Sequence, residues 1–241
     1  MNLFSKLTGH TQDLFSEIEG RFPEKSLLNM ALHASGPVHV LMVGPPAGGK
    51  TSFLKAIEKK YKGEVLYFNF TRTSGAGAQN DIIRNRKTVK IILADEIADA
   101  DKTTRAMFLD LMENGRITVT LADGKVDVTG LNVWVIATCN DISRIRRNQP
   151  QFLDRMQVIS VKPYTQEEYY RVAQFRLTKE GVTAEIAKYI AESMYKMHNS
   201  QDLRECVRVA KMAKTEHDVD EVIRNLVKLA PVKPDKKRPS E

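Results

Sequence analysis

Residues 44–52 have the composition and spacing of a loop that binds phosphate. The run Gly44-Pro45-Pro46-Ala47-Gly48-Gly49-Lys50-Thr51 fits the pattern G-x-x-x-x-G-K-T and lies between an apolar run at 38–43 and a helical stretch at about 50–61. Glycines let backbone N–H groups approach phosphate oxygens, and the start of the helix adds a partial positive charge. The flanking strand and helix disfavour the alternative of a mere glycine-rich turn. We expect nucleotide contacts from Gly44, Pro45, Pro46, Ala47, Gly48, Gly49, Lys50, Thr51 and Ser52.

Two adjacent carboxylates, Asp95 and Glu96, end an apolar run at 91–94. Parallel sheets bind ligands at the carboxyl ends of their strands, so these side chains are expected beside the phosphate loop. We expect Thr51 and Asp95 to bind Mg²⁺ and Glu96 to polarise the water that attacks the γ-phosphate of ATP. Lys50 is expected to reach the β- and γ-phosphates. Without the phosphate loop, the same Asp-Glu pair would indicate only that a buried strand ends there at the protein surface.

Strand-like and helical runs alternate over the first two thirds of the chain, which predicts an α/β fold with a parallel sheet sandwiched by helices. Strands are expected at 38–43, 65–70, 90–94, 133–138 and 157–161, and a β-hairpin at 116–129 around Asp123-Gly124. Residues 71–80 are expected to form a small-residue loop, followed by a short helix at 81–86. We expect an N-terminal helical segment (1–36) packed on the core, the α/β core (37–163), a small all-helical domain (164–230) and a disordered basic tail (231–241).

Composition restricts the class of protein without naming a function. The chain has 241 residues and a net charge of +7, which indicates an acidic partner such as nucleic acid, although the basic tail supplies part of the surplus. Two cysteines are too few for a disulfide framework. No apolar run reaches the roughly 20 residues that span a bilayer, and the N-terminus lacks the layout of a secretion signal. We expect a cytoplasmic protein with no membrane partner.

A later strand ends in Trp134-Val135-Ile136-Ala137-Thr138-Cys139-Asn140. Together with the phosphate loop and the Asp95-Glu96 pair, this order of motifs resembles AAA+ ATPases over roughly 37–229. The resemblance implies a P-loop NTPase core followed by a helical lid, and it makes Asn140 the sensor 1 residue, which contacts the γ-phosphate and the attacking water. An asparagine that only caps its strand is the alternative.

The segment Phe152-Leu153-Asp154-Arg155-Met156 resembles the arginine-finger segment of the family, with methionine where an aromatic residue is usual. The resemblance implies that Arg155 reaches the ATP of a neighbouring subunit, and therefore that the chain forms a ring, with six subunits expected. Arg146 and Arg147 are alternatives for the finger. The lid of the family carries an arginine called sensor 2, and Arg204 is the candidate for it here. The family pattern places that arginine two or three residues earlier, so the alternative is that sensor 2 is missing from this chain.

The hairpin before the sensor 1 strand resembles the insertion in RuvB-like branch-migration motors, MCM helicases and MoxR-type chaperones. With the basic residues Arg116, Lys125, Arg144, Arg146 and Arg147, this resemblance favours remodelling or translocation of DNA. RuvB-like motors carry a winged helix after the lid, which is not expected here, so a separate DNA-binding or adaptor subunit is a possible partner. The alternative is a MoxR-type protein-remodelling chaperone. A scaffold that binds ATP without cleaving it is disfavoured by Glu96, Asn140 and Arg155 together.

Overall fold

The computed structural model describes residues 14–121, 124–198 and 200–229. The chain divides into two compact units, Met1–Pro163 and Tyr164–Glu241, which are treated separately below. The predicted tail at 231–241 and the first thirteen residues of the N-terminal segment lie outside the described residues. Among the described residues, no helix combines the length and the apolar character needed to cross a membrane.

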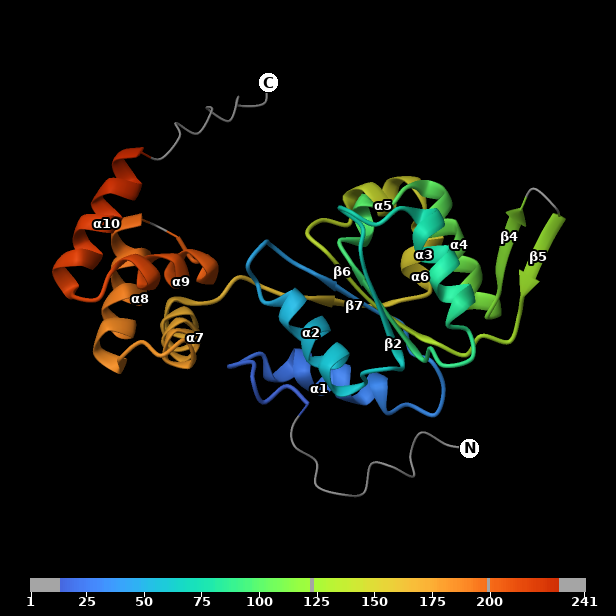
Figure 1. Ribbon diagram of the computed structural model, residues 1–241, viewed down its shortest axis with the longest axis horizontal. Coiled ribbons are helices and arrows are strands. Elements are labelled where there is room, and N and C mark those ends of the chain that lie inside the picture. Colours follow the sequence, from blue (N-terminus) through green and yellow to red (C-terminus); the bar gives the residue numbers. More distant parts are fainter. Residues whose placement is uncertain (1–13, 122–123, 199, 230–241) are drawn as a thin grey trace. The chain divides into compact units, whose positions relative to one another are not determined.

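A five-stranded parallel sheet forms the centre of the first unit (Figure 1). Its strands are β1 (Val40–Val43), β2 (Val65–Asn69), β3 (Ile91–Asp95), β6 (Trp134–Cys139) and β7 (Gln157–Ser160), in the order β2-β3-β6-β1-β7. Every residue of β3 and β6 is buried, as expected for strands covered on both faces. The α/β fold predicted from alternating strands and helices is confirmed.

Helices cover both faces of this sheet. On one face, α1 (Phe22–Leu32) and α2 (Lys50–Lys60) pack with Phe15 into one apolar cluster. On the other face, a second cluster joins the sheet to α3 (Gly75–Arg84), α4 (Lys102–Asn114), α5 (Ser143–Asn148) and α6 (Pro150–Asp154). A short 3₁₀ turn, η2 (Ile97–Asp99), follows β3. The turn η2 and the helices α5 and α6 are too short to give a clear periodic pattern in the sequence, and they were not predicted.

The expected loop at 71–80 is wrong from residue 75 onward, because helix α3 already begins at Gly75 and ends at Arg84, within the short helix expected at 81–86. Ser74 caps the helix by accepting a hydrogen bond from the Gly77 backbone N–H at 3.1 Å. A Cβ atom at position 75 would lie 1.9 Å from Thr104 Oγ1, so the glycine permits α3 to pack closely on α4. Glycine has a low helix propensity, and tertiary packing outweighs that propensity here.

The predicted hairpin is present as β4 (Ile117–Leu121) and β5 (Gly124–Val128), paired antiparallel with Ile117 opposite Val128. Asp123, the residue expected in its turn, lies outside the described residues. At the base of the hairpin, Arg116 forms an ion pair with Asp127 at 2.9 Å. Gln79 of α3 donates a hydrogen bond to the Thr118 carbonyl at 2.7 Å, which ties the hairpin to α3.

The second unit contains the helices α7 (Gln166–Lys179), α8 (Ala184–His198), α9 (Leu203–Met212) and α10 (Glu216–Leu229). Thr165 and Glu168 form a capping box that starts α7. The four helices share a core of their own around the fully buried Tyr169, whose hydroxyl lies 3.0 Å from Cys206 Sγ. This unit therefore has the separate core expected of a small helical domain.

Candidate functional site

The loop at 44–49 connects the carboxyl end of β1 to the start of α2. Gly49 precedes the helix with a φ of 88°, and Ala47 also has a positive φ of 64°. A Cβ atom at position 44 would lie 2.1 Å from the Val161 carbonyl oxygen, so only glycine fits there. The loop passes close to β7 and turns tightly into the helix, which suits a backbone that surrounds phosphate oxygens.

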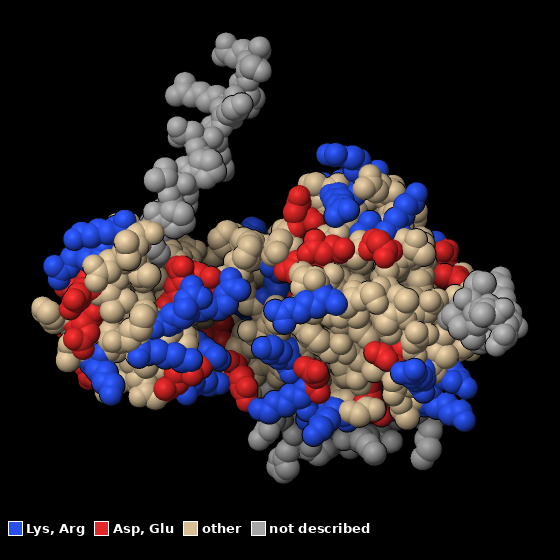
Figure 2. All heavy atoms as spheres, turned by 45° about the horizontal axis from the view of Figure 1, so that its top comes forward, with Lys and Arg blue, Asp and Glu red and all other residues tan. Residues whose placement is uncertain are grey.

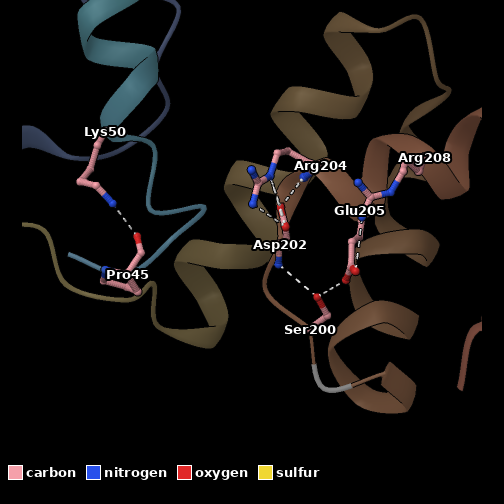
Figure 3. Close-up of polar contacts among 7 residues, drawn as sticks. All are labelled: Pro45, Lys50, Ser200, Asp202, Arg204, Glu205 and Arg208. Carbon is pink, nitrogen blue, oxygen red and sulfur yellow. Dashed lines mark hydrogen bonds and ion pairs between the residues drawn. The ribbon is translucent and has the colours of Figure 1, made fainter. Parts of the chain in front are cut away.

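The Lys50 side chain, which is 5% exposed, is turned back onto this loop. Its ammonium group donates hydrogen bonds to the carbonyls of Gly44 and Pro45, at 2.7 Å and 2.8 Å, and to Asn140 Oδ1 at 2.9 Å. Figure 3 shows the contact between Lys50 and Pro45. These acceptors are neutral oxygens, so an anionic phosphate is a stronger partner for the same charge.

The Asp95 carboxylate is held by hydroxyl groups from three elements. Tyr67 of β2 donates to Oδ2 at 2.8 Å, Thr138 of β6 donates to Oδ1, and Thr51 of α2 donates to Oδ2 at 3.3 Å. Burial raises the pKa of Tyr67, and its hydrogen bond to Asp95 adds to that shift. Thr51 and Asp95 are therefore adjacent, as predicted, whereas Tyr67 and Thr138 were not anticipated.

Glu96 follows Asp95 in a left-handed conformation, with φ 55° and ψ 47°. Such a conformation is unfavourable for a residue with a Cβ atom and is often found at functional sites. The Glu96 backbone N–H donates to Thr138 Oγ1 at 3.2 Å, and its carboxylate accepts from Asn140 Nδ2 at 3.0 Å. Burial raises the pKa of Glu96, while the charge of Lys50 acts in the opposite direction. The structure thus joins Lys50, Asn140 and Glu96 in one chain of contacts.

Arg155 lies apart from this chain of contacts, at the end of α6, where it forms an ion pair with Glu113 at 2.5 Å. The alternatives for the finger, Arg146 and Arg147, are exposed on α5 together with Arg144. Figure 2 shows basic side chains gathered at the top of the first unit. Acidic side chains are interspersed with basic ones over the rest of that face.

Residues 40–164, which contain the loop, the carboxylates and Asn140, match the family described as "ATPase family associated with various cellular activities (AAA)". The chain belongs to the AAA family. The match begins at β1 and ends just after β7. It therefore covers the whole parallel sheet, together with Asp95 and Glu96.

Curated relatives of this AAA chain include Lon proteases. The Lon protease of Clostridium acetobutylicum is 26% identical over 191 residues, which cover 67% of this chain and 23% of that protein. The Lon protease of Desulforamulus reducens is 24% identical over 231 residues, which cover 84% of this chain and 27% of that protein. The chain therefore spans about a quarter of the length of these curated relatives.

Solved structures share the AAA fold at low identity. Hsp104 of S. cerevisiae, in its complex with casein, superimposes with a TM-score of 0.64 at 16% identity, covering 89% of this chain and 45% of that one. A mutant of Thermotoga maritima RuvB superimposes with a TM-score of 0.63 at 16% identity, covering 86% of this chain and 71% of that one. These likenesses concern the fold.

The AAA match ends before Arg204, which lies in the second unit at the start of α9. Its guanidinium makes a two-point ion pair with Asp202, with Nε 3.0 Å from Oδ1 and Nη2 2.9 Å from Oδ2 (Figure 3). The hydrogen bonds and the charge of Asp202 raise the pKa of Arg204 above its usual value. Arg204 is exposed and its charge is engaged by a neighbour only two residues away.

Proposed function

We propose that the chain hydrolyses ATP at the phosphate loop, with Glu96 as the residue that polarises the attacking water. The observation that supports this function best is the continuous contact from Lys50 through Asn140 to Glu96. The γ-phosphate would displace the loop carbonyls from the Lys50 ammonium and accept from Asn140, which places it directly beside the Glu96 carboxylate. Gly44 to Ser52 would surround the phosphates.

The Thr51 hydroxyl and the Asp95 carboxylate suit Mg²⁺ because both are oxygen donors and lie within 3.5 Å of each other. Mg²⁺ bound to ATP needs only one or two protein ligands, since the phosphates and water supply the rest. When bound, it would neutralise charge that develops on the phosphate oxygens. Tyr67 and Thr138 fix the orientation of Asp95 for this role.

We further propose that the active form is a ring of identical chains, with six subunits, in which Arg155 completes the site of a neighbour. The Arg155 side chain is 43% exposed and lies apart from the nucleotide site of its own subunit. This position is consistent with action on another subunit. Arg204 remains the proposed sensor 2 residue, and it would have to leave Asp202 to contact a nucleotide.

For the substrate that is moved, we propose nucleic acid, as in RuvB-like motors. The exposed arginines of α5 are suited to sequence-independent contact with phosphate, because such binding needs charge rather than base recognition. Arg116 of the hairpin is engaged by Asp127, and the side chain of Lys125 lies outside the described residues, so α5 carries this proposal. A separate DNA-binding or adaptor subunit is part of it.

The second candidate is remodelling of protein, as in MoxR-type chaperones. It is supported by the curated Lon proteases, whose name says that they act on proteins, and by the Hsp104 structure determined with casein. The mixture of acidic and basic side chains in Figure 2 suits a protein partner as well as it suits nucleic acid.

The test is the ATPase rate as a function of protein concentration, with and without duplex, single-stranded and branched DNA, for the wild type and Glu96→Gln. A rate that rises steeply with protein concentration and with DNA, and that is lost in the variant, supports an oligomeric nucleic-acid motor. A concentration-dependent rate that is indifferent to every DNA, but rises with unfolded casein, supports the protein-remodelling candidate. Unchanged turnover in Glu96→Gln would refute the assigned site.

A further inference from the structure

Arg105 of α4 is among the largest fully buried side chains of the molecule, and no role in the proposed reaction accounts for it. Its guanidinium donates through Nη1 to the carbonyls of Ala98, at 3.2 Å, and of Ala100. Through Nε it donates to Gln149 Oε1 at 2.8 Å. The hydrogen bonds that the described residues show for Arg105 thus all end on neutral oxygens.

A buried guanidinium whose hydrogen-bond acceptors are neutral oxygens loses hydration without gaining a directly hydrogen-bonded counter-ion. Desolvation lowers the pKa of Arg105, and the nearby charge of Arg144 acts in the same direction, while the charge of Asp101 opposes both. An apolar side chain of similar volume usually stabilises a core as well or better. The arrangement is therefore better explained by what Arg105 connects than by a gain in stability.

Arg105 connects two segments that the proposed function uses separately. Ala98 and Ala100 belong to the turn that directly follows the strained Glu96. Gln149, which is 2% exposed, separates α5 from α6, the helix that is directly followed by Arg155. Gln149 is itself fixed to α4, since its amide donates to the Lys102 carbonyl at 3.2 Å.

We propose that Arg105 and Gln149 are positioning residues that couple the turn after Glu96 to the segment carrying Arg155. A change in the Glu96 turn shifts the Ala98 and Ala100 carbonyls, and the rigid guanidinium transmits that shift to Gln149. The nucleotide state of one subunit thereby sets the position of the arginine that it offers to the next subunit. This inference rests on the proposed action of Arg155 on a neighbouring site.

The test uses mixed oligomers of full-length chains in which hydrolysis occurs only between two kinds of subunit. An acceptor carrying Arg155→Ala keeps its own site but cannot serve a neighbour, and a donor carrying Glu96→Gln serves a neighbour but cannot hydrolyse. Neither is active alone, and mixing them restores turnover if Arg155 acts between subunits. Failure of this starting mixture would refute the ring mechanism, and the coupling with it, before any change at Gln149 is introduced.

Gln149→Leu is then placed in either partner. It removes the acceptor for Arg105 Nε and the amide that donates to the Lys102 carbonyl, but it leaves the contacts of Arg105 with the Glu96 turn. We expect the restored ATPase rate to fall at least fivefold when the change is in the donor, and less than twofold when it is in the acceptor. A purely structural defect would lower the rate similarly in both positions, and that result would overturn the proposal.

Two further variants separate coupling from packing. Gln149→Glu keeps an oxygen acceptor for Arg105, so the donor should retain at least half of the restored rate. Trp134→Phe is the matched control, because it removes another buried hydrogen bond, from Trp134 Nε1 to the Ala31 carbonyl at 2.9 Å, on the opposite face of the sheet. If Trp134→Phe in the donor lowers the rate as much as Gln149→Leu, the coupling is refuted.

Discussion

The side-chain amide of Asn140 donates a hydrogen bond to Glu96, with Nδ2 3.0 Å from Oε1. The orientation of that amide is set from its other end, because Oδ1 accepts from Lys50 at 2.9 Å. The residue that is proposed to polarise water is thus connected to the residue that is proposed to bind the γ-phosphate. If Lys50 binds the γ-phosphate as proposed, its arrival would change the partners of Asn140 and, through them, the freedom of Glu96.

Asn140→Leu should therefore lower the turnover number for ATP by about 100-fold, since oriented polar groups at a reacting centre commonly contribute that much. ATP affinity should change less than the turnover number, because the loop and Lys50 remain. Single-turnover hydrolysis and binding of a slowly hydrolysed ATP analogue measure the two quantities. The matched control is Asn85→Leu at the end of α3, whose Nδ2 donates to the Asp81 carbonyl at 2.8 Å. An equal loss in both variants would contradict the role given to Asn140.

The second prediction concerns the hydrogen bond between Tyr67 and Asp95. Tyr67→Phe deletes a single oxygen atom. It thereby removes one of the hydroxyl groups that orient Asp95, the proposed Mg²⁺ ligand. Loss of such a supporting contact commonly weakens metal affinity by about 10-fold or more. We expect the Mg²⁺ concentration for half-maximal ATPase activity to rise by about that factor, while the rate at saturating Mg²⁺ changes little.

A tyrosine–aspartate pair elsewhere provides the control for this prediction. Tyr189 of α8 donates to Asp220 Oδ1 at 2.9 Å within the helical unit, far in sequence from the phosphate loop. Tyr189→Phe should leave the Mg²⁺ dependence unchanged. If Tyr67→Phe behaves in the same way, Asp95 does not depend on Tyr67 for its orientation.

The sequence predicts those features that depend on local pattern. The buried strands are visible as apolar runs, and α7 begins at Gln166 because Thr165 and Glu168 form a capping box that the sequence displays. The carboxyl ends of β2 and β3 lie together, with Asn69 opposite Asp95, because parallel strands of similar length end at one edge. The phosphate loop, Asp95 and Glu96 lie close together for the same reason, since each follows the carboxyl end of a parallel strand.

Contacts between distant residues could not be predicted in this way. Arg105 and Gln149 are 44 positions apart, and neither residue type indicates a buried pair. The hydroxyl of Tyr67 reaches Asp95 only because β2 lies beside β3, an order that local patterns do not determine. The first part of helix α3, residues 75–80, is predicted as a loop because its glycines are poor helix formers, and its stability depends on close packing against α4.

The third prediction tests that packing. Gly75→Ala places a Cβ atom 1.9 Å from Thr104 Oγ1, and Thr104 is buried and β-branched, so it has little freedom to move. Overpacking of this kind costs about 1–3 kcal/mol, which exceeds the gain in helix propensity of at most about 1 kcal/mol. We expect a lower free energy of unfolding in urea. Gly36→Ala, which meets no atom within 4 Å, is the control and should be neutral or slightly stabilising.

The last prediction concerns the ion pair between Arg155 and Glu113, which lie 2.5 Å apart with both side chains 43% exposed. If Arg155 acts on a neighbouring subunit as proposed, Glu113 would compete with the nucleotide of that subunit for the same guanidinium. An exposed ion pair contributes about 0.2–1 kcal/mol, so its removal can favour the released arginine by up to about fivefold. Glu113→Gln should accordingly raise the ATPase rate by about two- to fivefold at protein concentrations below saturation.

Screening distinguishes this competition from other effects of the substitution. The advantage of Glu113→Gln should shrink as salt is raised to about 0.5 M, because mobile ions weaken the exposed pair in the wild type as well. Glu180→Gln is the control, since it breaks the exposed pair of Arg176 and Glu180 within α7 and should leave the rate unchanged. A fall in rate for Glu113→Gln, approaching that of Arg155→Ala, would show instead that Glu113 holds Arg155 in its working position. The sign of the change therefore decides whether this contact restrains the finger or supports it.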